Sequence, residues 1–173
     1  MKTLIVYYSW RGKTELVATS ISNVLDADLR KIEEVKKRKG LFGFISGGYG
    51  ALKRKCSRIK PLNFSLSSYN LVFIGTPVWA LRPTPAINTF ISKANFKDKK
   101  VVLFVTMGGF GGNKTVKMLT DKIKLKGGIV IASFVVKTGG VKTEDIIKKG
   151  EEIGREFLIK KSNCSGLSFY PVE

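Results

Sequence analysis

Four apolar runs spaced along the chain are the clearest pattern in the sequence. They are TLIVYYS (3–9), LVFIGTP (71–77), KVVLFVTM (100–107) and GIVIASFVV (128–136), and they are rich in Val, Ile and Phe. Runs that are apolar nearly throughout are typical of strands buried on both faces, as in a parallel sheet. We therefore expect these four segments to form the centre of a sheet.

The segments between these runs carry apolar residues at the period of an α-helix. One helix is predicted after SWRGKT (9–14), a second after RPTP (82–85), a third from Asn113 and a fourth from Thr143. Thr84 is a candidate N-cap with Pro85 in the first turn, and Lys160 and Lys161 end the last helix as its dipole favours. The apolar positions that carry the period are Leu16, Val17, Ile21, Val24 and Leu25; Ile87, Phe90 and Ile91; Val116, Leu119 and Ile123; and Ile146, Ile147, Ile153, Phe157 and Leu158.

With ADLRKIEEV (27–35) as the remaining strand, the chain repeats a strand and a helix five times. This alternation predicts an α/β fold, a doubly wound parallel sheet with right-handed crossovers. Ligands of such sheets bind beyond the carboxyl ends of the strands. The candidate functional segments are therefore SWRGKT (9–14), TPVWALRP (76–83) and MGGFGGN (107–113).

Two parts of the chain depart from this repeat. Residues 36–69 form a long irregular stretch with a short helix candidate at 44–53, and such stretches usually cover a site or are mobile. Residues 162–173 show no periodicity. We expect one domain over residues 1–161, followed by an irregular C-terminal tail over 162–173.

Composition removes several classes of chemistry. The 173 residues include no histidine, and the two cysteines, Cys56 and Cys164, do not form a Cys-x-x-Cys pair. A Cys/His zinc site, a Ser-His-Asp triad and a histidine general base are thus excluded. No apolar stretch approaches the roughly 20 residues that span a bilayer, and the N-terminus lacks the features of a secretory signal, so a cytoplasmic protein is expected.

Charge is the second unusual property. Thirty-one Lys and Arg against thirteen Asp and Glu give a formal charge of +18, which attracts polyanions and acidic protein surfaces. The basic residues are scattered, with the densest runs at 36–39, 53–60 and 160–161. Scattered charge is equally typical of solvated helix faces. A nucleic-acid-binding module would need an RNP-type aromatic pattern or a reading helix, and neither is recognisable.

The turn SWRGKT offers the chemistry of a phosphate site. Ser9 and Thr14 supply hydroxyls, Gly12 allows close approach of the backbone, and Arg11 and Lys13 add positive charge at the start of a helix. The alternative is an ordinary turn with a capping Ser or Thr. A triphosphate-binding loop does not fit, because it needs a glycine where this chain has Tyr7.

The other two candidate loops suit a flat ligand. Trp79 lies between Pro77 and Pro83, where an exposed indole would stack on a planar ring, although a tryptophan plugging the top of the core is the alternative. MGGFGGN places four glycines around Phe110, so its backbone can approach a ligand and donate N–H groups to ring oxygens.

These segments together resemble the flavodoxin-like proteins. The resemblance rests on YYSWRGKTELVA, GFISGGYGALKRK, YNLVFIGTPVWALRPTPAINTFI and VTMGGFGGNKT, in the family's order, and it extends from Lys2 to about Leu158. It implies a five-stranded parallel sheet in the order 2-1-3-4-5 and a bound flavin mononucleotide (FMN). Arg11 and Lys13 stand where the family commonly has Thr or Ser and Asn, and the strongly basic charge differs from the acidic electron-carrying flavodoxins. The implied cofactor-binding residues are Ser9, Trp10, Arg11, Gly12, Lys13 and Thr14 for the phosphate, with Thr76, Pro77, Val78, Trp79, Ala80, Leu81, Met107, Gly108, Gly109, Phe110, Gly111 and Gly112 for the ring system.

The function that this resemblance implies is electron transfer or the reduction of a small acceptor by an FMN protein, whose cofactor carries the chemistry. As an enzyme it would be an FMN-dependent NAD(P)H oxidoreductase acting on a quinone or similar acceptor. The expected partners are an acidic redox protein or a small anionic or quinone-type acceptor. The alternative is a basic module that binds nucleic acid or another polyanion without flavin. In the electron-carrying flavodoxins that the chain resembles, this loop often has a glycine whose peptide turns over to accept a hydrogen bond from flavin N5 after one electron has arrived. Residues 76–81 contain no glycine, so this reversal is expected to be costly, and the resemblance implies a preference for two-electron chemistry.

Overall fold

The computed structural model of the protein describes residues 2–35 and 56–163. Its parallel strands are β1 (Thr3–Tyr7), β2 (Asp28–Lys31), β3 (Leu71–Trp79), β5 (Lys100–Met107) and β6 (Ile129–Lys137), and they lie in the order β2-β1-β3-β5-β6. The predicted α/β class and strand order are thus confirmed. A sixth, two-residue strand, β4 (Arg82–Pro83), pairs antiparallel with the end of β3 and was not predicted.

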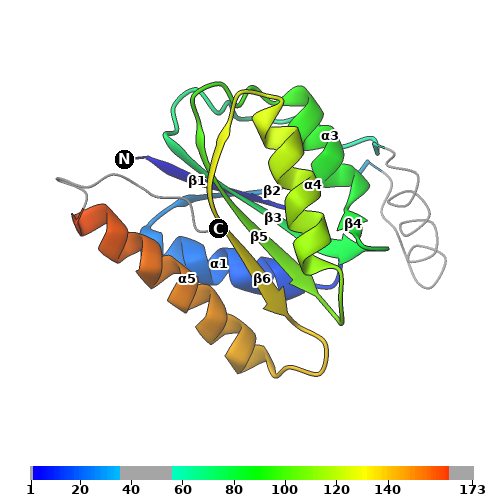
Figure 1. The fold of residues 1–173 in the computed structure, drawn as a ribbon, viewed down its shortest axis with the longest axis vertical. Helices are drawn as coiled ribbons and strands as arrows, with labels where there is room; N and C mark the ends of the chain where they lie inside the picture. The colour runs from blue at the N-terminus through cyan, green and yellow to red at the C-terminus, as the bar shows by residue number, and fades with distance from the viewer. Residues whose placement is uncertain (1, 36–55, 164–173) are drawn as a thin grey trace.

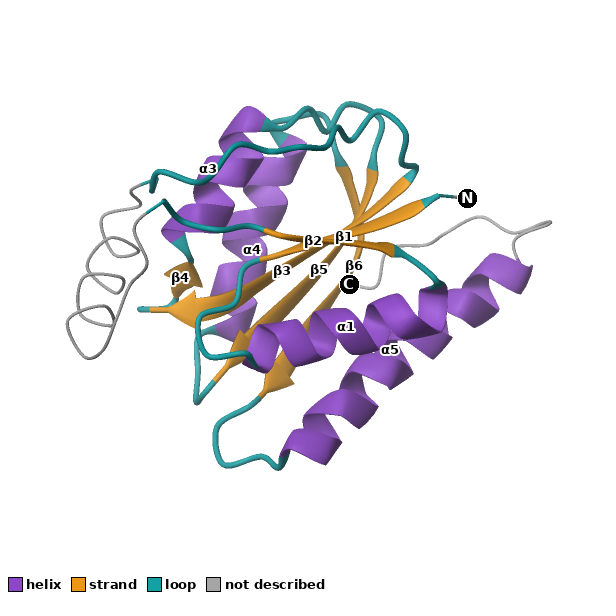
Figure 2. Cartoon of the chain, turned by 180° about the vertical axis from the view of Figure 1, so that it is seen from behind, coloured by secondary structure: helices purple, strands orange, loops and turns teal. Residues whose placement is uncertain are grey.

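Helices cover both faces of the sheet (Figures 1 and 2). Helices α1 (Lys13–Leu25) and α5 (Thr143–Asn163) lie on one face, and α3 (Pro85–Lys93) and α4 (Gly112–Lys124) on the other. Each helix begins within three residues of its predicted start. Helix α5 continues to Asn163, two residues past the predicted domain boundary, whereas the rest of the tail and the helix candidate at 44–53 fall outside the described residues.

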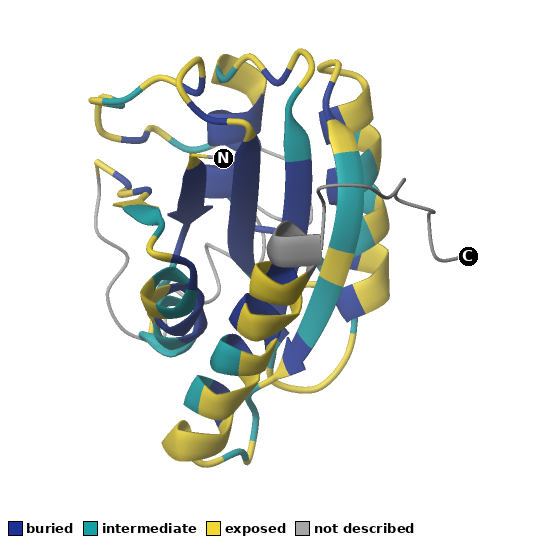
Figure 3. Cartoon of the chain, turned by 90° about the vertical axis from the view of Figure 1, so that its left-hand side faces the viewer, coloured by how far each residue is buried: buried dark blue, intermediate teal, exposed yellow. Residues whose placement is uncertain are grey.

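Alternation along the strands divides the core into two halves. In β1, Leu4 and Val6 face α3 and α4, whereas Ile5 and Tyr7 face α1 and α5. Figure 3 shows the central strands buried and β6 only partly so. The expectation that all four runs are buried on both faces is therefore wrong for β6, because β6 lies at the edge and, within the described residues, pairs only with β5.

Two close helix contacts fix how α5 lies on α1. A Cβ at Gly150 would lie 2.6 Å from the Cβ of Ser20, and one at Gly154 would lie 2.7 Å from the Cβ of Val24. Small residues at these positions let the two helices approach closely. This packing sets the direction in which α1 runs away from the turn that precedes it.

Candidate functional site

The parallel register brings three loops to one edge of the sheet. Tyr7 of β1 lies beside Gly75 of β3, and Pro77 of β3 lies beside Thr106 of β5. The loops after these strands contain SWRGKT, the end of TPVWALRP and MGGFGGN. The structure therefore brings the three predicted segments to the same edge.

The turn at 9–14 leaves a row of backbone N–H groups open. Gly12 is the N-cap of α1 and has φ of 84°, in the left-handed region that glycine adopts at little cost. Within the described residues, the N–H groups of 11–14 donate no hydrogen bond, whereas the Leu16 N–H is bonded to the Gly12 carbonyl. Ser9 Oγ accepts from the Glu15 N–H at 3.3 Å, so Ser9 caps the helix as the alternative predicted. The cap satisfies one donor and leaves the preceding four free.

Two cations flank these open donors. The Arg11 guanidinium lies over the Trp10 ring, 4.5 Å from its centroid, and is exposed. Lys13 is half-buried and forms no ion pair with a described carboxylate. Convergent N–H groups, the positive end of a helix dipole and two full charges together favour a bound anion.

Thr14 connects this turn to the end of β5. Its side chain is 2% exposed, and its Oγ1 lies 2.7 Å from the Thr106 Oγ1, with either atom able to donate. The hydroxyl predicted to face a phosphate is thus hydrogen-bonded inside the protein here. This link between two candidate loops could not be foreseen, because the two threonines lie 92 positions apart.

The segment TPVWALRP is mostly not a loop. After β3 leaves β5 at Pro77, it continues to Trp79 and turns back, so that Val78 pairs with Pro83 and Trp79 with Arg82. Ala80 and Leu81 form the turn with φ of 46° and 61°. A two-residue hairpin with both central residues at positive φ matches the twist of the strands. The prediction of a loop beginning at Thr76 is wrong for Thr76 to Trp79.

The turn at Ala80 and Leu81 also bears on the prediction drawn from the absence of glycine in residues 76–81. A residue with a Cβ at positive φ costs about 1 kcal/mol or more, and Ala80 and Leu81 already carry that cost in this structure. The penalty therefore does not distinguish one redox state from another. The preference for two-electron chemistry stays a prediction without that support.

Trp79 is not exposed as expected. It is 6% exposed, and its ring makes edge contacts with Tyr8 and Trp10 at centroid distances of 5.7 and 5.9 Å. This packing corresponds to the core alternative. The Tyr8 hydroxyl in turn donates to Glu34 Oε2 at 2.9 Å, and Glu34 is buried. No pattern in the sequence predicts this buried carboxylate, because Glu34 lies in a polar stretch of the chain.

The glycine-rich loop is held against the hairpin. Gly111 is the N-cap of α4 at φ of 95°, and a Cβ there would lie 2.6 Å from Leu81 Cδ2 and 3.1 Å from Leu81 Cα. Phe110 is 79% exposed, and the N–H groups of 109–112 donate no hydrogen bond within the described residues. The loop thus offers open donors and one exposed ring beside the hairpin.

Comparison with known proteins agrees with this arrangement. A family model described as flavodoxin matches residues 51–146, more than half of the chain. The protein belongs to the flavodoxin family. A flavoprotein of Lactobacillus acidophilus, solved in complex with FMN, is 26% identical and superposes with a TM-score of 0.68 over 78% of this chain and 92% of its own.

Other relatives of this flavodoxin-family protein extend the likeness. Flavodoxin 2 of Bacillus cereus shares the fold at 17% identity, with a TM-score of 0.63 over 92% of this chain and 99% of its own. An uncharacterised protein of Methanocaldococcus jannaschii is 27% identical over 91% of this chain and 99% of its own length. In the described part of the chain, no helix is long and apolar enough to cross a membrane, and no group of three or more Cys, Asp or Glu could hold a metal ion.

One ionic network of this flavodoxin-family protein lies beside the turn at 9–14 and involves Glu15 of α1. Glu15 accepts hydrogen bonds from the Tyr7 hydroxyl at 2.9 Å and from Lys31 Nζ at 2.8 and 3.0 Å. Burial acts to raise the pKa of Glu15, but these hydrogen bonds outweigh it and the pKa lies below its usual value. Burial and the bond to Glu15 raise the pKa of Tyr7 well above its usual value. Glu15 therefore stays ionised and satisfied beside the turn.

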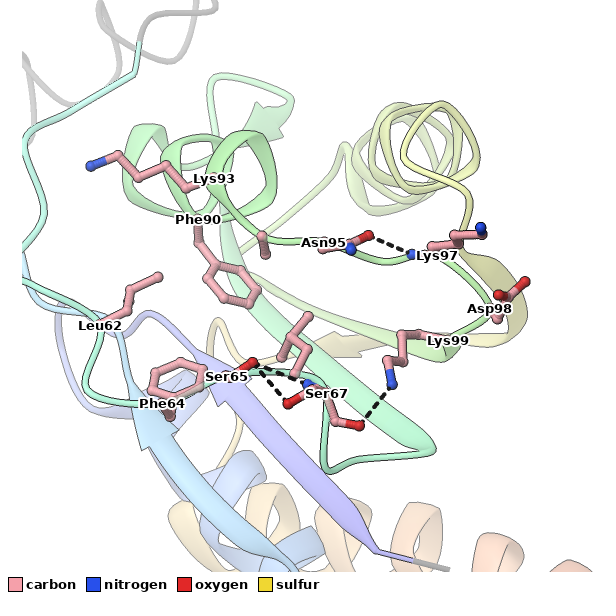
Figure 4. Close-up of a pocket in the computed structure, with 12 residues that line it drawn as sticks. Leu62, Phe64, Ser65, Ser67, Phe90, Lys93, Asn95, Lys97, Asp98 and Lys99 are labelled. Atoms are coloured by element: carbon pink, nitrogen blue, oxygen red, sulfur yellow. Dashed lines mark hydrogen bonds between the residues drawn. The ribbon is translucent and has the colours of Figure 1, made fainter.

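A cavity of about 470 Å³ lies away from these loops, between α3 and the segment that precedes β3 (Figure 4). Phe64 and Phe90 form part of its wall. Figure 4 shows the ammonium groups of Lys93 and Lys97 directed away from these rings, and Lys99 is bonded to the Ser67 and Tyr69 carbonyls. The Ser65 hydroxyl, the Asn95 amide oxygen and the Lys99 ammonium at its wall are already hydrogen-bonded within the protein, so the candidate site remains the three loops at the carboxyl edge.

Proposed function

We propose that this flavodoxin-family protein binds FMN and acts in electron transfer or in the reduction of a small acceptor. The observation that supports this proposal most directly is the row of open N–H groups at 11–14. It lies at the start of α1, with Arg11 and Lys13 beside it. A phosphate monoester dianion has the charge and the acceptor oxygens that this turn can satisfy. The residues present therefore fit the phosphate of FMN.

The remaining loops would hold the ring system. Open N–H groups at 109–112 suit the carbonyl oxygens of an isoalloxazine, and the exposed Phe110 ring can cover an apolar edge. When bound, the flavin supplies one- and two-electron chemistry, and the protein supplies binding, orientation and electrostatics. Trp79 would need to leave its present edge contacts to stack on the ring, so we propose Trp79 as a neighbour of the cofactor.

The proposed partners follow from charge at this edge. Arg11, Lys13, Lys114 and Lys142 form no ion pair with a described carboxylate. We propose an acidic redox protein or a small anionic or quinone-type molecule as the electron donor or acceptor. If the protein is an enzyme, the reaction that fits is oxidation of NAD(P)H with reduction of such an acceptor.

The test is a titration of the protein freed of flavin with FMN and with riboflavin, which lacks the phosphate. Hydrogen bonds to a charged group contribute about 1.5 to 3 kcal/mol each, so FMN should bind at least tenfold more tightly. The double substitution Arg11→Gln and Lys13→Gln should weaken FMN binding and leave riboflavin binding unchanged. The matched control removes two exposed cations far from the turn, Lys97 before β5 and Lys124 at the end of α4, by Lys97→Gln and Lys124→Gln. Equal affinities of the two flavins for the unsubstituted protein would contradict the phosphate assignment.

A further inference from the structure

Arg82 is a half-buried cation with an unsatisfied donor at the edge of the candidate site. It lies in β4, directly after the turn formed by Ala80 and Leu81, and opposite Trp79. Its Nη1 is buried and has no hydrogen-bond partner within the described residues. A buried charged donor without a partner is costly and uncommon in folded proteins, so such a group calls for an explanation.

The carboxylates at this edge are engaged elsewhere. Glu15 is bonded to Lys31 and Tyr7, and Glu34 accepts from the Tyr8 hydroxyl. Glu33 forms an ion pair with Lys60. Within the described residues, the protein therefore supplies no counter-ion for Arg82.

The backbone holds Arg82 in this place at a cost. Two consecutive residues at positive φ, Ala80 and Leu81, turn the chain so that Arg82 falls opposite Trp79. Strain of this kind clusters where a site needs one particular geometry. Leu81 also packs on Gly111, which fixes the hairpin beside the glycine-rich loop. Arg82 thus stands by the loops proposed for the ring, rather than in the row of open N–H groups proposed for the phosphate.

We propose that Arg82 recognises the negative group of a small planar acceptor, such as an aromatic carboxylate or sulfonate. This inference rests on the proposed function, since it names the acceptor class for that site. The side chain is partly exposed, so a small molecule can approach it from solvent, and a guanidinium binds a carboxylate or sulfonate with two parallel hydrogen bonds. We propose a small molecule rather than an acidic protein, because a compact anion needs only a narrow approach beside the partly buried side chain to reach Nη1.

The experiment compares two probes of equal shape, naphthalene-2-carboxylate and naphthalene-2-carboxamide. Binding is measured by calorimetry on the protein saturated with FMN and on the flavin-free protein. We expect the anionic probe to bind the FMN-saturated protein about 10- to 100-fold more tightly than the amide, which is the value of one charge-assisted contact. The preference should disappear in Arg82→Gln, persist in part in Arg82→Lys, and remain in Lys137→Gln, which removes an exposed cation at the same edge.

Measuring probe binding at different salt concentrations distinguishes a contact with Arg82 from general attraction of an anion to a protein with a charge of +18. A desolvated contact is screened weakly, so the preference should survive 0.5 M salt, whereas attraction to scattered surface charge should not. Equal binding of the two probes, loss of the preference in Lys137→Gln, or its collapse in salt would overturn the proposal. So would a loss of discrimination between FMN and riboflavin in Arg82→Gln, because Arg82 would then hold the cofactor phosphate.

Failure of the proposed function gives a different result. If FMN does not bind the unsubstituted protein, the flavin titration shows it directly, and the proposed function fails. The comparison of probes on the flavin-free protein then still tests whether Arg82 is an anion site. If FMN binds and the probes show no preference that depends on Arg82, only the acceptor assignment fails.

Discussion

The hydrogen bond between Thr14 and Thr106 joins the turn at 9–14 to the end of β5, and substituting valine at each position tests it. Valine has nearly the shape of threonine and lacks the hydroxyl. The two oxygen atoms are 2.7 Å apart, and the two residues are 2% exposed. Either single substitution leaves one buried hydroxyl without its partner, which costs about 1 to 3 kcal/mol of the free energy of unfolding.

The double substitution should cost much less than the sum of the two singles. Once Thr14→Val has stranded the Thr106 hydroxyl, Thr106→Val removes that stranded group. We expect the double variant to lie within about 1 kcal/mol of the less stable single variant, with a coupling energy in the range of roughly 0.5 to 3 kcal/mol. Urea unfolding of the flavin-free protein, followed by circular dichroism, measures the free energy of unfolding of the two single variants and the double variant against that of the unsubstituted protein. An unchanged m-value shows that the unfolded states are comparable.

The same variants separate structure from binding. If the Thr14 hydroxyl also reaches the phosphate, Thr14→Val should weaken FMN binding about tenfold or more, whereas Thr106→Val should not, because it leaves the Thr14 hydroxyl in place. Riboflavin affinity serves as the control and should be equal in both variants. Stability losses that add within about 0.5 kcal/mol would refute the hydrogen bond as a coupled pair.

Two further predictions concern the glycine-rich loop and the acid limit of stability. Gly111→Ala should lower the free energy of unfolding by more than about 1 kcal/mol, because it puts a Cβ at φ of 95° and 2.6 Å from Leu81. Gly109→Ala is the control, because a Cβ there meets nothing within 4 Å, and it should change the free energy by less than about 1 kcal/mol in either direction. Equal losses for the two variants in urea unfolding would contradict this prediction. The hydrogen bond from the Tyr69 hydroxyl at 2.7 Å, together with the charge of Lys2, lowers the pKa of Asp28 in the folded protein. Ionised Asp28 therefore adds to the free energy of unfolding above its unfolded pKa of about 3.9, and this stabilisation is lost as the pH falls through the lower folded pKa. The free energy of unfolding, measured from pH 6 to 2, should therefore change less with pH in Asp28→Asn than in the unsubstituted protein. An equal pH dependence of the two proteins would contradict the stabilising role of the Tyr69–Asp28 hydrogen bond.

The sequence alone determined the class of fold and brought the three candidate segments to one edge of the sheet. Continuous apolar runs separated by segments of helical period can only bury their surfaces as a parallel sheet between two layers of helices. Because the carboxyl ends of parallel strands meet at one edge, the positions of SWRGKT, TPVWALRP and MGGFGGN followed from their places at the ends of β1, β3 and β5. Local signals also placed the helix starts, since Pro85 and Thr143 each begin a helix where turn chemistry predicts one.

Tertiary structure decided which side chains within those segments are free. Trp79 is buried, because Tyr8 and Trp10 from the loop after a neighbouring strand pack against it. Thr14 is hydrogen-bonded to Thr106, a partner far along the chain. The buried donor of Arg82 likewise depends on a hairpin that forms only after β3 has run past its neighbour β5. Hydrophobic period and turn propensity act over a few residues, whereas burial and hydrogen bonding of a side chain are set by elements that the sheet brings together from distant parts of the sequence.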